Sequence, residues 1–291
     1  MDEISLKALA KINLGLDVVR RRADGYHEVR MIMQTIHLYD RLDIAKCDEP
    51  GIHITTNLSF LPVNENNLIY KAGELLMDEF AISSGVTVRL NKRIPVAAGM
   101  AGGSTDAAAM LYGMNSLFDL HLKRSELMER GVKIGADVPY CLMRGTALAE
   151  GIGEKLTALA PMVKCPVLIA KPQISVSTKF VYENLKLNEQ TPHPDITQLV
   201  HDIEVQDLTA IGAHMGNVLE TVTIPEYPII EDIKNCMKAA GAVNAMMSGS
   251  GPTVFGLFAD EKTAQEAYEA MQRSGLAKQI YLTSIYNNRR A

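Results

Sequence analysis

The sequence predicts an α+β protein built from two domains, and three observations support this. The chain has 291 residues, which is more than one hydrophobic core usually serves. Patterns typical of strands and of helices are mixed along it without strict alternation. A fresh apolar strand begins after Cys165 and Pro166, following the short strand and turn near residue 150. We therefore expect one domain at residues 1–160 and a second at 161–291.

The first strand of the expected N-terminal domain covers residues 4–19. There Ile12, Leu14 and Leu16 alternate with polar residues, which is typical of a half-buried strand. Two further strands should follow closely after a turn at residues 23–25. Beyond them, apolar residues at helical spacing predict helices, and short apolar runs predict strands. The expected strands are 29–38, 40–45, 85–90 and 147–149, and the expected helices are 66–80, 104–117 and 124–134.

The expected C-terminal domain also mixes both kinds of element. A loop rich in proline at residues 191–194 should lie on the surface. The expected helices are 177–185, 207–219, 229–240 and 263–274, and the expected strands are 167–170, 243–247, 253–259 and 279–285.

Charge and composition exclude several classes of function. The net charge of −5 lacks the basic surplus with which nucleic-acid binders neutralise phosphates. The four cysteines are widely spaced, which suits a reducing compartment. The acidic N-terminus does not resemble a signal peptide, and no uncharged apolar run reaches the roughly 18 residues of a membrane helix. We expect a cytoplasmic monomer or weak homodimer, with neither nucleic acid nor membrane as partner.

A loop of small residues between a predicted strand and a predicted helix is the main candidate site. Small residues let a ligand approach the backbone closely, and the first amides of a helix attract phosphate. No lysine precedes Ser104, so the loop is not a P-loop, and it lacks the Gly-x-Gly-x-x-Gly spacing of dinucleotide sites. We interpret it as a cradle for the phosphates of ATP. Its residues are Pro95, Val96, Ala97, Ala98, Gly99, Met100, Ala101, Gly102, Gly103, Ser104 and Thr105.

A structural alternative for this loop stays open. Small residues also permit tight packing of a helix on a sheet, and Ser104 could then act only as a helix N-cap. Motifs of this kind have real false-positive rates. The loop alone therefore does not decide between the two interpretations.

Three segments together resemble the GHMP kinases, the family of galactokinase, homoserine kinase and mevalonate kinase. Residues 10–16, 95–105 and 247–255 are similar to the three family signatures, in the same order along essentially the whole chain. Ala98 and Ala101 stand where some members have glycine. The resemblance implies an ATP-dependent small-molecule kinase. It also implies an N-terminal domain similar to domain 2 of ribosomal protein S5 and a ferredoxin-like C-terminal domain.

The resemblance implies two catalytic residues. Asp137 would be the general base that accepts the proton of the acceptor hydroxyl. From the residues alone, a helix N-cap explains Asp137 about as well. Lys11 would lower the pKa of Asp137 or stabilise charge that develops during phosphoryl transfer. Its alternative is an exposed lysine on a strand.

The resemblance also implies a substrate with a cytidine diphosphate moiety and a tertiary hydroxyl, in the non-mevalonate isoprenoid pathway. Four segments carry this narrower likeness: 11–13, 22–27, 135–139 and 150–154. Aromatic rings stack on pyrimidines, and amide or imidazole groups bond to their edges. The expected substrate-binding residues are Asn13, Tyr26, His27 and Tyr182, although core packing explains Tyr182 almost as well.

The remaining ATP contacts are also implied by the resemblance. Asn67 and Lys92 would contact adenine, and their alternatives are a helix cap and a surface lysine. Magnesium usually keeps several waters and few protein ligands, and Ser104 is the one ligand we name. Two other functions compete with this one. They are a GHMP kinase for homoserine or a mevalonate derivative, and a family-like binding protein without catalysis.

Overall fold

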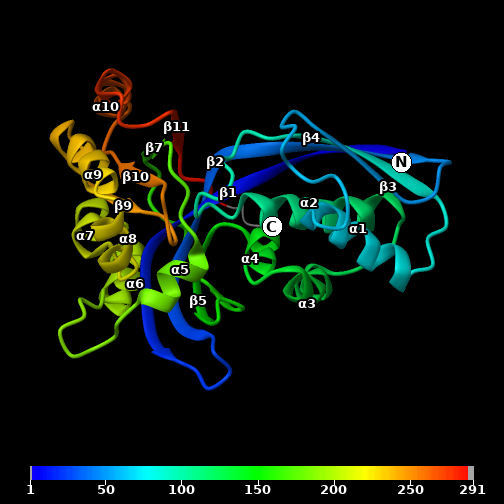
Figure 1. The fold of residues 1–291 in the computed structure, drawn as a ribbon, viewed down its shortest axis with the longest axis horizontal. Coiled ribbons are helices and arrows are strands. Elements are labelled where there is room, and N and C mark those ends of the chain that lie inside the picture. Colours follow the sequence, from blue (N-terminus) through cyan, green and yellow to red (C-terminus); the bar gives the residue numbers. More distant parts are fainter. Residues whose placement is uncertain (1, 288–291) are drawn as a thin grey trace. The chain divides into compact units, whose positions relative to one another are not determined.

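The computed structural model describes residues 2–287, and two long strands dominate its N-terminal part. β1 (Glu3–Arg21) and β2 (His27–Cys47) are neighbours in one sheet and form a hairpin (Figure 1). In the turn, Arg22 N donates to Tyr26 O at 2.8 Å. The predicted strand at 4–19 is confirmed. The two strands predicted at 29–38 and 40–45 are in fact one strand.

The chain divides into two compact units that interleave in sequence. The first unit is Met1–Ala10, Leu38–Val96 and Ala101–Met143, and the second is Lys11–His37, Ala97–Met100 and Arg144–Ala291. This partition differs from one cut near residue 160, because β1 and β2 each contribute residues to both units. The domain limits 1–160 and 161–291 stay a prediction.

A sheet and four helices make up the first unit. β4 (Gly85–Asn91) pairs with β2 on one side and with β3 (Ile52–Thr56) on the other. The helices are α1 (Leu68–Glu79), α2 (Gly102–Leu117), α3 (Arg124–Ile134) and α4 (Val138–Met143). A Cβ on Gly113 of α2 would lie 2.4 Å from Ile44 Cδ1, so α2 rests directly on the sheet. This contact fixes the position of α2, the helix that follows the candidate loop.

The second unit contains a four-stranded antiparallel sheet. Its order is β11 (Gln279–Ser284), β7 (Pro166–Lys171), β10 (Val254–Leu257) and β9 (Asn244–Met247). α9 (Ile229–Ala239) and α10 (Glu261–Ser274) pack on it. This order and the β-α-β-β-α-β succession are those of a ferredoxin-like layer, so that expectation is confirmed, as is the α+β class.

Shorter elements complete the second unit. β5 (Thr146–Gly151) pairs with β2 and with β6 (Lys155–Ala158), while β8 (Gly216–Asn217) pairs with β1. The helices before α9 are α5 (Thr178–Asn184), α6 (Ile196–Glu204), α7 (Leu208–His214) and α8 (Glu220–Glu226). The helix expected at 207–219 is therefore wrong in its extent, since α7 ends at His214 and β8 follows. Across residues 2–287, no helix has the length and apolarity to span a membrane.

Candidate active site

The candidate phosphate loop turns sharply before α2. Ala97, Gly99 and Ala101 have φ values of 51°, 69° and 55°, in the left-handed region. The first bond of the helix runs from Thr105 N to Ala101 O at 2.8 Å. The amides of residues 102–104 precede that bond and have no acceptor four residues earlier in the helix. Open amides at the start of a helix attract anions, and the contact of this loop with phosphate stays a prediction.

Residues Ala97–Met100 of the loop belong to the second unit and rest on the turn at 248–253. Ser248 Oγ donates to Gly99 O at 2.9 Å. A Cβ on Gly99 would lie only 2.0 Å from Ser248 O, so no larger residue fits. Ser248 N also donates to Thr253 O at 2.9 Å, which closes the turn. The third signature segment therefore supports the tip of the loop.

Asn217 supports that turn and was not singled out from the sequence. It is only 7% exposed, and its Nδ2 donates to Met247 O at 2.9 Å and to Gly249 O at 2.8 Å. Its Oδ1 accepts from Leu219 N at 3.0 Å. The signal in the sequence is a single amide side chain within the apolar run around 215–219. A buried amide needs hydrogen-bond partners, and here they are carbonyl groups of a distant turn.

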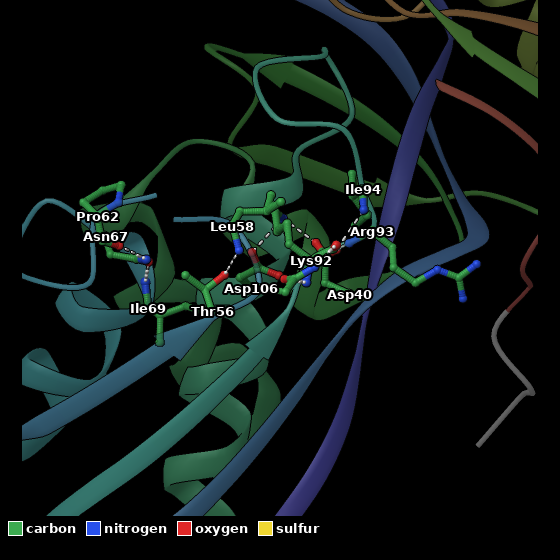
Figure 2. A network of polar contacts seen from close by, with 11 residues as sticks. Asp40, Thr56, Leu58, Pro62, Asn67, Ile69, Lys92, Arg93, Ile94 and Asp106 are labelled. Carbon is green, nitrogen blue, oxygen red and sulfur yellow. Dashed lines mark hydrogen bonds and ion pairs between the residues drawn. The ribbon is translucent and has the colours of Figure 1, made fainter. Parts of the chain in front are cut away.

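Lys92 lies in a buried polar cluster with Asp40 and Asp106, shown in Figure 2. Its Nζ donates to Asp40 Oδ2 and, at 2.8 Å, to Asp106 Oδ2. Burial raises the pKa of Asp106 well above its ordinary value, although the Lys92 charge opposes this. The alternative of a surface lysine is wrong, because Lys92 is 7% exposed. Its contact with adenine stays a prediction.

Asn67 caps α1, as its structural alternative proposed. Its Oδ1 accepts from Ile69 N at 2.9 Å, and its Nδ2 donates to Pro62 O at 2.7 Å (Figure 2). An N-cap of this kind satisfies an amide that the helix leaves open. A contact between Asn67 and adenine stays a prediction.

Lys11 is buried on β1, so the alternative of an exposed strand lysine is wrong. Its Nζ donates to Asn13 Oδ1 at 2.7 Å, and Asn13 Nδ2 contacts Met31 Sδ at 3.3 Å. Lys11 N also donates to Met100 O at 3.2 Å, which ties the strand to the loop. Among residues 2–287 its ammonium forms no ion pair, so its positive charge stays available to an anionic ligand.

Asp137 stands immediately before α4 and is half-buried. Its backbone oxygen accepts from Cys141 N at 3.0 Å. Its carboxylate makes no hydrogen bond with any residue from 2 to 287, so it does not act as a side-chain cap there. A carboxylate without a partner is free to accept a proton.

His27 and Tyr182 lie together in the second unit, and their contact with the substrate stays a prediction. Their ring centroids are 5.1 Å apart with an interplanar angle of 39°. Burial, and secondly the charge of Arg21, lower the pKa of His27, which favours the neutral ring. Tyr26 is 61% exposed at the hairpin turn. Two aromatic rings so placed can receive a planar base.

Comparison with known proteins decides the family. The models for the GHMP kinases N terminal domain and the GHMP kinases C terminal match residues 67–145 and 199–277. A 4-diphosphocytidyl-2-C-methyl-D-erythritol kinase of Lachnospira eligens is 57% identical, with 98% of this chain and 99% of that protein covered. The chain belongs to the GHMP kinases, in the branch of the 4-diphosphocytidyl-2-C-methyl-D-erythritol kinases.

Solved structures agree with a GHMP kinase. A crystal structure of 4-(cytidine 5'-diphospho)-2C-methyl-D-erythritol kinase superimposes with a TM-score of 0.84 at 29% identity, covering 98% of this chain and 100% of that one. A homoserine kinase from Cytophaga hutchinsonii gives a TM-score of 0.77 at 22% identity, covering 99% of this chain and 96% of that one, and shows the shared fold.

The GHMP kinase contains no group of three or more metal-ligating side chains within its described residues.

Proposed function

We infer that this GHMP kinase transfers the γ-phosphoryl group of ATP to the 2-hydroxyl of 4-diphosphocytidyl-2-C-methyl-D-erythritol, a step of the non-mevalonate isoprenoid pathway. The observation that carries this inference is the match at 57% identity over nearly the full length of a kinase with that substrate in its name. The phosphate loop and the pair of His27 and Tyr182 supply two binding features that such a reaction needs.

ATP fits the start of α2. The open amides of residues 102–104 and the helix dipole stabilise negative charge on the phosphates. Gly103 is exposed, so a phosphate can approach the backbone there. Magnesium would be held by the ATP phosphates and the half-buried hydroxyl of Ser104, since this ion binds few protein ligands. Bound there, it would neutralise phosphate charge.

Asp137 acts as the general base in this proposal. The O–H bond of the acceptor breaks and its proton passes to the Asp137 carboxylate, while the oxygen forms a bond to the γ-phosphorus. The bond from that phosphorus to the β–γ bridging oxygen breaks, and ADP leaves with the electron pair. Such transfers depend mostly on positioning and charge stabilisation.

Lys11 stabilises the charge that develops on the transferred group. Lys11 is 5% exposed and its ammonium donates to Asn13 Oδ1, so the side chain is held in one orientation. A fixed positive charge acts more strongly in a site with little water. Asn13 orients Lys11 in this scheme, and its contact with cytidine stays a prediction.

The cytosine ring lies against His27 and Tyr182. Stacking on aromatic side chains contributes about 1–3 kcal/mol per base. The neutral imidazole of His27 also offers a nitrogen lone pair to an amino group of the base. These contacts separate the proposed substrate from homoserine and mevalonate, which have no base.

The test is an assay of ADP release with a panel of acceptors. The purified chain should release ADP with 4-diphosphocytidyl-2-C-methyl-D-erythritol and show no rate above background with homoserine or mevalonate. Mass spectrometry should find one added phosphoryl group on the acceptor. A faster rate with homoserine or mevalonate would move the chain to another group of GHMP kinases.

A further inference from the structure

We propose that Asp40, Lys92 and Asp106 are positioning residues for ATP, which clamp the first turn of α2 and thereby set the affinity of the kinase for its nucleotide. This inference rests on the proposed function. The three residues come from β2, from the segment after β4, and from α2. They therefore tie together β2, the segment that leads into the phosphate loop and the helix that follows this loop.

The Asp40 carboxylate is the centre of the clamp. Its Oδ1 accepts from Arg93 N and, at 2.8 Å, from Ile94 N, and its Oδ2 accepts from Lys92 Nζ. Asp40 is fully buried. Hydrogen bonds that a carboxylate accepts from backbone amides and an ammonium are stronger than those between neutral groups. The chain that leaves β4 is thus held at three successive residues, as Figure 2 shows.

The backbone of Lys92 is fixed as well as its side chain. Lys92 N donates to Asn57 Oδ1 at 2.7 Å, and Asn57 Nδ2 donates to Lys92 O at 3.1 Å. Both ends of the lysine are therefore immobilised. The ammonium cannot move to follow a ligand without breaking its buried bonds to Asp40 and Asp106, which would leave charges unpaired.

The Lys92 ammonium lies against the start of α2. A Cβ on Gly102 would be 2.9 Å from Lys92 Nζ and 3.2 Å from Ile94 Cγ2. Gly102 is the first residue of the helix, so the clamp reaches the turn whose amides face the phosphates. A displacement near 1 Å of groups that position a substrate can cost about 10²-fold in rate.

Asp106 completes the clamp from the helix side. Its Oδ2 accepts from Lys92 at 2.8 Å, whereas its buried Oδ1 has no partner among residues 2–287. An ionised carboxylate in that state would be costly, and burial raises the pKa of Asp106. A protonated Asp106 leaves the cluster neutral, with Lys92 balanced by Asp40. The cluster beside the start of α2 then carries no net charge.

Two variants of Asp106 test the proposal, with KM for ATP, KM for the acceptor and ADP affinity by calorimetry as readouts. Asp106→Leu removes the bond to Lys92 and should raise KM for ATP and the Kd of ADP about tenfold or more, while KM for the acceptor stays within about twofold. Asp106→Asn keeps a neutral side chain and an oxygen for Lys92, so it should restore most of the ATP affinity. Glu79→Gln, which breaks a surface ion pair with Arg130 between α1 and α3, is the control and should change neither KM.

The outcomes separate the two proposals. Equal KM values for ATP in wild type and Asp106→Leu would overturn the clamp, and so would a rise of both KM values together. A large loss of ATP affinity in Asp106→Asn would overturn the neutral state. Wild-type chain that binds ADP but phosphorylates no acceptor would instead overturn the proposed function, and the calorimetry would still test the clamp.

Discussion

At the scale of single residues, the candidate site contains two buried lysines, Lys11 and Lys92, that differ in their partners. Lys11 is an ammonium with an amide partner and no carboxylate among the described residues, whereas Lys92 is an ammonium held by the carboxyl groups of Asp40 and Asp106. The first can serve a ligand with its charge, and the second has its charge already balanced. This contrast is why we assign chemistry to Lys11 and positioning to Lys92.

Asp137→Asn should lower kcat by about 10²–10⁴, since an amide of the same shape cannot accept the proton. Lys11→Met should also lower kcat strongly, because it removes the charge and keeps most of the side-chain volume. Steady-state ADP release measures both, with thermal unfolding to show that each variant is folded. Asp119→Asn is a matched control from the same unit, at a left-handed position that asparagine tolerates. Rates near wild type for Asp137→Asn would remove its role as base.

Tyr182→Ala should raise KM for the acceptor about tenfold, because about 1.4 kcal/mol of stacking corresponds to a factor of ten. KM for ATP should not change. Tyr182→Phe retains the ring and should stay near wild type. Phe180→Ala, an exposed aromatic on the same helix α5, serves as control. If Tyr182→Ala and Phe180→Ala behave alike, the ring pair does not bind the base.

Single residues also show where the sequence could not give the fold. The sequence predicts two strands, 29–38 and 40–45, where the structure has the single strand β2, and the second of them begins at Asp40. Asp40 is a buried carboxylate that binds Lys92 and two amides, residues far away along the chain. No local rule predicts such partners. By contrast, the local pairing of Lys11 with Asn13 follows from their places on one face of a strand.

At the scale of elements, the loop before α2 is shaped by close contacts as much as by its ligand. Its left-handed residues and the turn at 248–253 leave no space at Gly99. Gly103 differs, since a Cβ there would meet only Leu68 Cδ1 at 3.4 Å, an ordinary contact. The fold therefore requires glycine at position 99, whereas at position 103 only a bound ligand would require it.

Gly99→Ala should lower both stability and ATP affinity, because its Cβ would clash with Ser248 O at a φ of 69°. Gly103→Ala should leave the unfolding midpoint within a few degrees of wild type but raise KM for ATP, since the new methyl group occupies the approach of a phosphate. Thermal unfolding and KM for ATP measure the two effects. A Gly103→Ala variant with unchanged ATP affinity would show that no phosphate comes close to that residue.

Elements with a strong local pattern were predicted well, and short ones were not. α2 is buried on nearly all sides and was found within two residues of its true start. The sequence does not predict α6, because its apolar residues Ile196, Leu199 and Ile203 follow the proline-rich loop at 191–194. β3 and β6 have five and four residues, too few for a pattern to emerge without their partners.

At the scale of the whole molecule, β1 and β2 belong to both compact units. Each unit contains one part of each of these two strands. If one unit unfolds, the strands in the other unit therefore lose their ordered continuation. Sequence patterns place strands well but say little about which contacts they share. This is why a single boundary near residue 160 was the natural prediction from sequence.

We expect the chain to unfold in one cooperative transition, and Asn217→Ala provides the test. The substitution removes the bonds to Met247 O and Gly249 O, all within the second unit, and unsatisfied buried groups cost about 1–3 kcal/mol each. Hydrogen exchange measures the free energy of opening for each amide. If the units unfold together, this free energy should fall by the same amount for the α2 amides in the first unit and for the β10 amides in the second. Wild-type protection of α2 in a variant whose β10 is destabilised would show that the units unfold separately, and two transitions in urea would then accompany it.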